Sequence, residues 1–547
     1  MVAVVVLSII DIDSQILVMA SLLTSPGTLR TQAVADPGEQ KTIISRWIDA
    51  ITTEVASGNV KTVGGNRGPT ISARFYSLVG TAAYEAFQAT QKKVKSTVNN
   101  YRKAKIPLLN YQTEVGSEFQ EVDLVSDLIS ATILKVATNK ISGLTDKGIL
   151  NLKAFETSVL SASKDSDYWD KSDIEKISSE IAQKVVKAYA NDGYNAPEDY
   201  TSANSLDNII LIDKWTPEYN QSDIPASGIQ SYLTPQWGKV TPFGISSDKL
   251  ASITSNAANP HSFLLDTNNK YNLKSGTITD IVSGEVYEIN KSLIGSYINP
   301  DFIEQANKVI EFSQALSNTP QGAIKKATAE FWEDGAGTPF PPGTWMVLGQ
   351  ALSLENNYGL QQDAELFLGL GATVHAAAIS AWDLKLQDNY ARPIRAIRNL
   401  SSFGLLRDED PNTPGSQFRA FNRSTGTVDL ISGIQFETYQ LPNGGYSPPF
   451  AEYTSGHSTF SSSSAEFLTK FSGKKEFPWD INFTLTFPFT NSLGKNVTLE
   501  YESLSEAAVA AGDSRLWGGI HFNDGNDNGL LIGKQIGAEI YDIFSSL

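Results

Sequence analysis

Three short segments in the C-terminal half of this 547-residue chain place cations and imidazoles at spacings that suit an anionic ligand. In the first segment, Lys385 stands seven residues before Arg392, and Pro393 follows. At about 100° per residue, seven residues return to nearly the same helix face, so both cations would face one anion. Pro393 disfavours helical geometry at Arg392, so we expect the helix to end there with the guanidinium leaning off its end. Taken alone, the pair also fits a solvated basic stripe.

The second segment reads Tyr-Thr-Ser-Gly-His and ends at His457. Ser455 is a suitable N-cap for a helix that we expect to end near Lys470, and the free backbone N–H groups of a helix N-terminus bind oxyanions. A bound anion would stabilise the imidazolium form of His457, which therefore suits general acid–base chemistry. The alternative for this segment alone is a capped helix with an incidental histidine.

The third segment contains Arg515 and His521, with Gly518 and Gly519 between them. Two consecutive glycines disfavour a continuous helix, so a loop can bring both side chains into one pocket. The alternatives are an arginine paired with a surface carboxylate and a histidine satisfied within the core.

Two other features are interpreted as structural. Asp524 and Asn526 imitate the start of a calcium loop, but its twelfth position is Gln535 instead of a bidentate Glu, so an EF-hand is rejected. His261 and His375 are assigned no chemical role, and His375 is expected to pack within an Ala-rich helix.

The ordered set of Lys-x6-Arg-Pro, Ser-Gly-His and Ser-Arg-x5-His fixes nine positions. At roughly one in twenty per position, a chance coincidence is negligible. The set resembles the vanadium-dependent haloperoxidases and the related acid phosphatases of the type 2 phosphatidic acid phosphatase superfamily. Residues 448–460 and 518–522 are most similar to the bacterial haloperoxidase branch, and the resemblance runs from Ala329 to the C-terminus. Thr454 stands where many relatives have Pro.

The resemblance implies vanadate as the cofactor. It implies that His521 binds the metal through a ring nitrogen, that His457 deprotonates hydrogen peroxide on the opposite side, and that Asp334 orients His457. Three cations, a hydroxyl and a backbone N–H would hold the oxygens of vanadate, and Lys385 would also polarise the bound peroxide. These oxygen-binding groups belong to Lys385, Arg392, Arg515, Ser455 and Gly456.

The implied activity is the oxidation of a halide by hydrogen peroxide to hypohalous acid, which halogenates a small organic acceptor. Trp382 and Phe450 resemble an aromatic pair beside the site in a fungal chloroperoxidase; such apolar walls desolvate a halide and exclude a bulky phosphate ester. Ordinary core packing is the alternative for both rings. The halide, the acceptor and the oligomeric state stay open.

Two other functions are considered. The first is an acid phosphatase that uses His457 as acid and His521 as nucleophile. The second is a non-catalytic helical protein that binds an oxyanion, which the presence of His457 disfavours because anion binding alone does not require it.

The acidic balance of the chain argues against nucleic acid as a partner. With 43 basic and 60 acidic residues, the net charge is −17, which repels a phosphate backbone. Cysteine is absent, which excludes disulfides, thiolate metal sites and a cysteine nucleophile. Only three methionines are present. A shortage of both oxidation-prone residue types suits an enzyme that makes strong oxidants, and a composition bias explains it equally well.

The elements that position these residues are expected to be mainly α-helices. Apolar residues recur at helical spacing in two regions, and strand-like sequence separates the second and third segments. The helical stretches are 40–58, 71–93, 119–140 and 173–193 in the first region and 302–316, 344–357, 360–391 and 528–547 in the second.

We therefore predict two helical bundles, with the active site in the C-terminal one and a small β insertion. The predicted divisions are a tail or targeting segment at 1–39, an N-terminal bundle with a long loop excursion at 40–300, and a vanadate-binding bundle at 301–547. The apolar run from Val2 to Ile10 lacks a preceding basic residue, so a signal peptide is doubtful, and Met19 is an alternative start. No membrane span is expected. The compartment is open, with export slightly favoured for a soluble protein.

Overall fold

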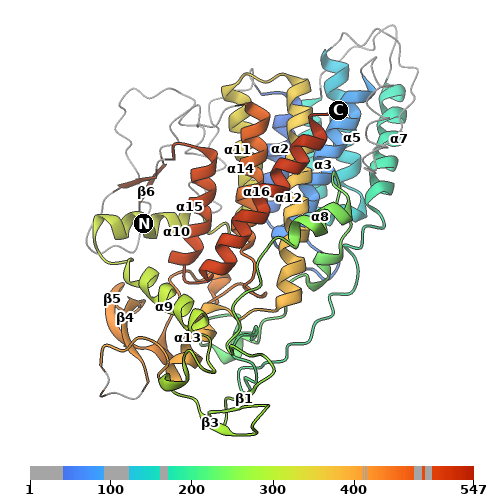
Figure 1. The fold of residues 1–547 in the computed structure, drawn as a ribbon. Coiled ribbons are helices and arrows are strands. Elements are labelled where there is room, and N and C mark those ends of the chain that lie inside the picture. The colour runs from blue at the N-terminus through green and yellow to red at the C-terminus, as the bar shows by residue number, and fades with distance from the viewer. Residues whose placement is uncertain are drawn as a thin grey trace.

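The structure is a computed structural model that describes residues 41–90, 122–160, 171–410, 412, 415–473, 483–486, 496–499 and 501–546. Most of these residues are helical, which confirms the expected mainly α fold (Figure 1). The N-terminal segment 1–39 lies outside the described residues, together with the doubtful signal peptide and the alternative start at Met19.

The helices of the first region stand beside one another at one end of the molecule, coloured blue to cyan in Figure 1. Four of them confirm the sequence-based expectation. The fifth, α6, was not expected, because only Gly148 and Leu152 of its residues are buried and its apolar pattern is correspondingly weak. These helices are α2 (Ile43–Ala56), α3 (Pro69–Ala89), α5 (Val122–Ala137), α6 (Asp146–Val159) and α7 (Lys171–Tyr189).

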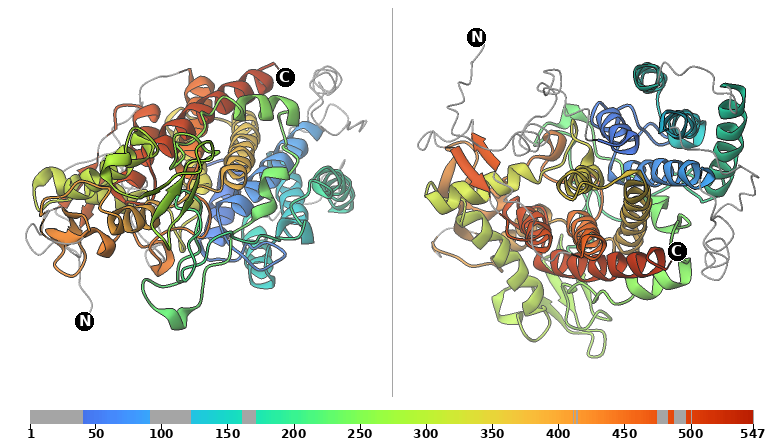
Figure 2. Two further views of the ribbon diagram at one scale, coloured as in Figure 1. Left: turned by 60° about the horizontal axis from the view of Figure 1, so that its bottom comes forward. Right: turned by 90° about the horizontal axis from the view of Figure 1, so that it is seen from above.

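Three helices of the second region, α11, α14 and α16, pack on the long α12, which also packs on α3 and joins the two regions. One hydrophobic core cluster runs through both regions, so the division at residue 300 remains a prediction. Seen from above, the helices of the two regions lie next to one another (Figure 2). The helices are α9 (Pro300–Gln314), α10 (Pro320–Phe331), α11 (Phe340–Glu355), α12 (Leu360–Asp388), α13 (Pro393–Ser402), α14 (Gly456–Ser472), α15 (Leu504–Trp517) and α16 (Asn523–Phe544).

Helix α12 is the central helix of the molecule. It is long and apolar enough to cross a membrane, but 94% of its most apolar stretch is buried inside the protein, as in the core helix of a globular protein. Small residues let it approach α3 closely. A Cβ at Gly80 of α3 would lie 2.2 Å from the Phe367 carbonyl oxygen, so only glycine fits there.

Helices α14 and α16 approach each other even more closely. Gly529, Gly533 and Gly537 recur every fourth residue along one face of α16. A Cβ at these positions would lie 2.9, 2.5 and 2.1 Å from backbone oxygens of α14. The Ser-rich run in α14 fits the same contact, and Ser462 Oγ donates to the Leu530 carbonyl at 2.6 Å. This contact places the start of α14 beside the start of α16.

Strands make a small contribution to the fold, in three antiparallel sheets among the described residues. The third sheet confirms the expected insertion between the second and third chemical segments. The strands are β1 (Lys270–Asn272), β2 (Thr277–Thr279), β3 (Val286–Glu288), β4 (Gln417–Asn422), β5 (Thr427–Ser432), β6 (Phe483–Thr486) and β7 (Asn496–Leu499). Tyr271 pairs with Ile278 in the first sheet, and Phe418 with Ile431 in the second.

The excursion at 194–300 is an ordered cover over the helices. Trp215, Trp237 and Phe243 are buried, as expected. The excursion contains sheet β1–β3, the short helix α8 (Ser247–Thr254) and several 3-10 turns. It therefore contributes to the core, and its segment at 215–233 reaches the candidate site.

Candidate active site

Lys385 and Arg392 approach the site from two different helices. Helix α12 ends at Asp388, Asn389 adopts a left-handed conformation (φ 47°), and Arg392 has an extended backbone as the N-cap residue of α13. The prediction that both cations lie on one helix face was therefore wrong. Asn389 ends the helix earlier than the Pro393 rule indicated, and Pro393 instead occupies the first position of a new helix, where its missing N–H costs nothing.

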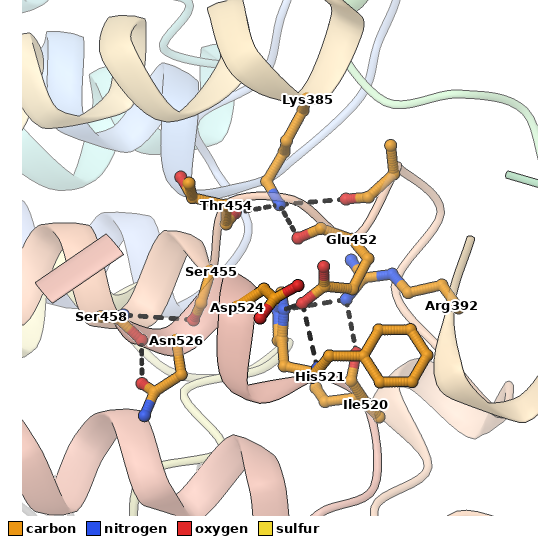
Figure 3. Close-up of polar contacts among 12 residues, drawn as sticks. Lys385, Arg392, Glu452, Thr454, Ser455, Ser458, Ile520, His521, Asp524 and Asn526 are labelled. Carbon is orange, nitrogen blue, oxygen red and sulfur yellow. Dashed lines mark hydrogen bonds and ion pairs between the residues drawn. The ribbon is translucent and has the colours of Figure 1, made fainter. Parts of the chain in front are cut away.

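Both cations nevertheless bind the same loop, residues 450–454, which precedes α14. The Lys385 ammonium donates to the carbonyl oxygens of Ala451, Glu452 and Thr454 at 3.0, 2.9 and 2.6 Å (Figure 3). Arg392 Nε donates to the Phe450 carbonyl at 2.9 Å. Both side chains are fully buried, and burial lowers the pKa of Lys385 well below its usual value and that of Arg392 to about 10.

The start of α14 has the predicted form. Ser455 is its N-cap residue, with Oγ accepting from the backbone N–H of Ser458 at 3.3 Å. The Ser455 N–H donates to the Gly525 carbonyl at 2.8 Å, which ties this helix start to α16. Gly456 lies against Trp382, where a Cβ would be 3.5 Å from the indole ring.

His457 lies in the first turn of α14 and is half-buried. Its Nε2 is 3.2 Å from the Glu333 carbonyl oxygen. Because a carbonyl only accepts, Nε2 carries the proton and Nδ1 is the basic nitrogen. Burial, followed by the charge of Arg515, lowers the pKa of His457 well below its usual value, so the ring is neutral and able to accept a proton.

Arg515 is fully buried near the end of α15 and lies close to His457. Its Nη1 donates to the same Glu333 carbonyl at 3.5 Å, and its Nη2 donates to the Ala329 carbonyl at 3.1 Å. Burial lowers the pKa of Arg515 to about 10. The shared carbonyl brings the second and third sequence segments together.

His521 follows α15 and contacts groups on both sides of its ring. Nδ1 lies 2.5 Å from Glu452 Oε1, and Nε2 lies 3.1 Å from Arg392 Nη1 (Figure 3). Arg392 also donates from Nη1 to the Ile520 carbonyl at 2.8 Å. Burial, with added effects of the nearby cations, lowers the pKa of His521 well below its usual value.

Glu452 is a site residue that the sequence patterns did not indicate. It is fully buried, and burial raises its pKa to about 8, while the charges of Arg392 and Lys385 act in the opposite direction. Residues 448–460 contain no other acidic residue. The only sequence signal that could have identified Glu452 as a site residue is its position as the single carboxylate in a stretch of apolar and small residues.

Asp334 does not take the expected position. Its carboxylate accepts from Thr344 Oγ1 at 2.7 Å, and in the described part of the chain no hydrogen bond joins it to His457. The contact to His457 comes from the backbone of Glu333, one residue earlier. Asp334 has a left-handed backbone (φ 45°), and its side chain bonds to α11. The prediction that its carboxylate orients His457 is therefore corrected.

Trp382 and Phe450 form an aromatic wall beside the cations. Their ring centroids lie 4.9 Å apart at 47°. Trp382 Nε1 donates to the Leu233 carbonyl at 3.1 Å, so the excursion completes this wall. The Lys385 ammonium and the Arg392 guanidinium each lie 5.1 Å from the centre of the Phe450 ring, within the range of cation–π attraction.

The three cations remain without carboxylate partners. Among the described residues, none of Lys385, Arg392 and Arg515 forms an ion pair within 4.0 Å. All three charges lower the pKa of both His457 and His521, so the five groups share one region. Arg392 Nη2 is buried and has no hydrogen-bond partner in the described chain. A buried donor without an acceptor is costly, and an oxyanion would satisfy it. The donor set therefore fits vanadate or phosphate.

The calcium-loop-like segment at Asp524 and the two remaining histidines, His261 and His375, take part in contacts within the fold. Residues 523–544 form a helix, in which Asp524 binds His261 Nδ1 at 2.5 Å, and this excludes the calcium loop. Asn526 Oδ1 accepts from Ser458 at 2.7 Å. His375 is fully buried in α12, 6.4 Å from the ring of Tyr189.

Comparisons with known proteins concern the fold that carries these residues. Residues 365–547 match the family model described as the VCPO second helical-bundle domain. The structure resembles a holo-type bacterial vanadium-dependent chloroperoxidase (TM-score 0.63, 16% identity, covering 88% of this chain and 93% of that one). It also resembles the first bacterial vanadium-dependent iodoperoxidase (TM-score 0.59, 16% identity, covering 92% of this chain and 95% of that one). No curated protein is significantly similar to the chain.

These matches confirm the resemblance that the three segments indicated. At 16% identity the structural likeness establishes the fold and leaves the reaction to be tested. Residues 365–547 match the VCPO second helical-bundle domain, and over most of its length the chain shares its fold with a bacterial vanadium-dependent chloroperoxidase and a bacterial vanadium-dependent iodoperoxidase.

Proposed function

We propose that this chain is a vanadium-dependent haloperoxidase that uses hydrogen peroxide to oxidise a halide to hypohalous acid, which then halogenates a small organic acceptor. Three buried cations that form no ion pair with any described carboxylate, gathered around two neutral imidazoles, are the observation that carries this proposal. Such a site needs an anion to balance its charge.

The chain supplies a complete set of groups to hold vanadate. His521 would bind the metal through Nε2, and Arg392 would donate from its unpartnered Nη2. Lys385, whose donors all meet carbonyls here, would exchange one carbonyl for an oxygen of the anion. The remaining donors would come from Arg515, the Ser455 hydroxyl and the Gly456 N–H. When bound, vanadate supplies a Lewis acid that activates peroxide without a change in oxidation state.

His457 would act as the general base of the reaction. Its neutral ring would take a proton from hydrogen peroxide at Nδ1, because Nε2 is engaged by the Glu333 carbonyl. Burial, aided by the charge of Arg515, would keep the ring neutral until that proton arrives, since both lower the pKa of His457.

The aromatic wall favours the peroxidase over the acid phosphatase alternative. Trp382 is buried against Phe450, and both rings lie beside Lys385. Apolar rings would strip water from a small halide and leave little room for a phosphate ester. The likeness to both a chloroperoxidase and an iodoperoxidase leaves the halide open.

A direct assay tests the proposal. The purified protein is loaded with orthovanadate, given hydrogen peroxide with chloride, bromide or iodide in turn, and followed by halogenation of a phenolic dye. We expect activity with at least one halide that vanishes in His457→Ala and His521→Ala and persists in His261→Gln, whose exposed imidazole lies outside the proposed set. Hydrolysis of a phosphate ester by the vanadate-free protein, with no halogenation, would overturn the proposal in favour of the phosphatase.

A further inference from the structure

Glu452 contacts the ring of His521 on the side opposite Arg392. Its Oε1 lies 2.5 Å from His521 Nδ1 and also accepts from the Phe522 N–H at 3.1 Å (Figure 3). The two residues belong to different elements, 69 positions apart in the chain. Both side chains are buried, so water does not compete for this contact.

The surroundings of His521 allow one neutral tautomer. Arg392 can only donate, so Nε2, at 3.1 Å from its Nη1, must be the unprotonated nitrogen. Nδ1 then carries the proton and donates it to Glu452. Oε1 of Glu452 then accepts two N–H groups, one from His521 and one from the Phe522 backbone. The lone pair of Nε2 consequently faces the cations.

The backbone of Glu452 is held firmly in place. Its N–H donates to the Tyr390 carbonyl at 3.0 Å, and its own carbonyl accepts from Lys385 at 2.9 Å. These two hydrogen bonds fix the position from which the Glu452 side chain extends toward the imidazole of His521.

Gly525 provides the space that the carboxylate occupies. A Cβ at this position would lie 2.1 Å from Glu452 Oε1 and 2.8 Å from both Cδ and Oε2. Any side chain at 525 would displace Glu452. Conversely, a short carboxylate placed at 525 would enter the same space when the side chain of Glu452 is removed.

We propose that Glu452 is a positioning residue that holds His521 as the Nδ1–H tautomer, so that Nε2 is presented to a bound vanadate or phosphate, and that Gly525 is required to admit it. The inference rests on the proposed function only for the identity of the ligand. Carboxylates that bind the second nitrogen of a metal-ligating histidine fix its tautomer and orientation, and their loss weakens metal affinity roughly 10- to 100-fold.

The tautomer can be measured without any ligand. In protein labelled with ¹⁵N-histidine, long-range proton–nitrogen spectra distinguish the two ring nitrogens, and only four histidines contribute. His521→Gln assigns the signals. We expect Nδ1–H for His521 in the wild type and in Glu452→Gln, whose amide oxygen still accepts. In Glu452→Ala only the Arg392 contact still favours Nδ1–H, so we expect a mixture of the two tautomers.

Orthovanadate affinity provides the second measurement. We expect binding to weaken roughly 10- to 100-fold in Glu452→Ala and less in Glu452→Gln. The double variant Glu452→Ala/Gly525→Asp should recover much of the affinity and the Nδ1–H tautomer. Glu218→Ala is the matched control, since it removes another buried carboxylate, which binds Arg395 away from His521.

The results separate this inference from the proposed function. An unchanged tautomer together with wild-type affinity in Glu452→Ala would overturn the positioning role. A wild type that binds no vanadate would overturn the proposed cofactor, while the tautomer measurement would still decide the role of Glu452. If the double variant does not fold, the contrast between Glu452→Ala and Glu452→Gln decides.

Discussion

Arg74 and Arg392 are both fully buried but have opposite surroundings. Arg74 of α3 donates from Nε to the Asp192 carboxylate at 2.6 Å, and its guanidinium lies 3.8 Å from the ring centre of Tyr194. Arg392 is held by backbone carbonyls and the His521 ring, and one of its nitrogens has no partner in the described chain. Arg74 therefore has a carboxylate partner within the fold, whereas Arg392 forms no ion pair within 4.0 Å among the described residues.

This difference distinguishes a structural cation from a ligand-binding one. Burial of an unpaired charge is expensive, and a partner must supply the compensation. For Arg74 the partner belongs to the chain. For Arg392, and equally for Lys385 and Arg515, we propose that a bound anion supplies the compensation. The contrast predicts opposite consequences when each cation or its partner is removed.

The largest expected effect is on stability in the first region. Asp192→Ala leaves Arg74 buried without its carboxylate, which should lower the free energy of unfolding by about 3–5 kcal/mol. Orthovanadate affinity of the folded protein should not change. Urea unfolding and a vanadate titration measure the two quantities. A weakened affinity with unchanged stability would remove the distinction between the two arginines.

At the candidate site we expect a loss of ligand affinity without a loss of stability. Arg392→Met should weaken orthovanadate binding at least 100-fold, or about 3 kcal/mol, because it removes a charge-assisted donor pair. Its unfolding free energy should stay the same or rise, because an uncompensated buried charge is lost. Arg392→Lys is the matched control, which keeps the charge without the planar fork and should bind with intermediate affinity. Wild-type binding by Arg392→Met would contradict the comparison.

A buried anion extends the comparison. Asp363 of α12 accepts from the hydroxyls of Thr42 and Ser353, and burial raises its pKa from 3.8 to about 6. Because the folded state holds this proton more tightly than the unfolded chain, the contribution is favourable at low pH. It is lost as the pH rises from about 4 through about 6, by about 2–3 kcal/mol.

Asp363→Asn should remove this pH-dependent loss. The measurement is the free energy of unfolding of both proteins at pH 4.5 and 7.5, and the difference between their pH dependences isolates this carboxyl. Equal pH dependences would show that the hydroxyls compensate the ionised form fully.

The smallest effect is stabilisation by an added anion. Orthophosphate at tenfold excess over its Kd should raise the free energy of unfolding by about 1.4 kcal/mol. We expect this increment in the wild type and in Asp192→Ala, and none in Arg392→Met at the same concentration. Thermal unfolding with and without phosphate measures it. An increment retained in Arg392→Met would place the anion elsewhere.

The helices were predictable where the apolar period is long. Helices α3 and α12 bury nearly continuous faces, and their sequences show it. Helix α10 was missed, because Pro320–Phe331 is short and half of its buried residues are alanines. The end of α12 was misplaced, because the left-handed conformation of Asn389 is a local choice that a proline rule does not include.

The candidate site was only partly predictable. Lys385, Arg515 and His521 could be identified as candidate site residues from their types and their order in the sequence, without any structure. Glu452 carries no periodic signal, since it lies in an irregular loop and its partner is 69 residues away. Asp334 was misassigned because its turn directs the carboxylate to Thr344 and leaves the preceding carbonyl beside His457.

The sequence by itself determined the chemical inventory of this protein: three cations and two imidazoles in an ordered set, within a mainly helical chain. Only the tertiary structure decided which buried arginine has a carboxylate partner and which nitrogen of His521 accepts a hydrogen bond from Arg392. The physical reason is that charge compensation and tautomer choice depend on contacts between distant segments, such as Arg74 with Asp192 and His521 with Glu452. The local sequence pattern specifies which residue types are present, and the packing of distant segments specifies which of these residues contact one another.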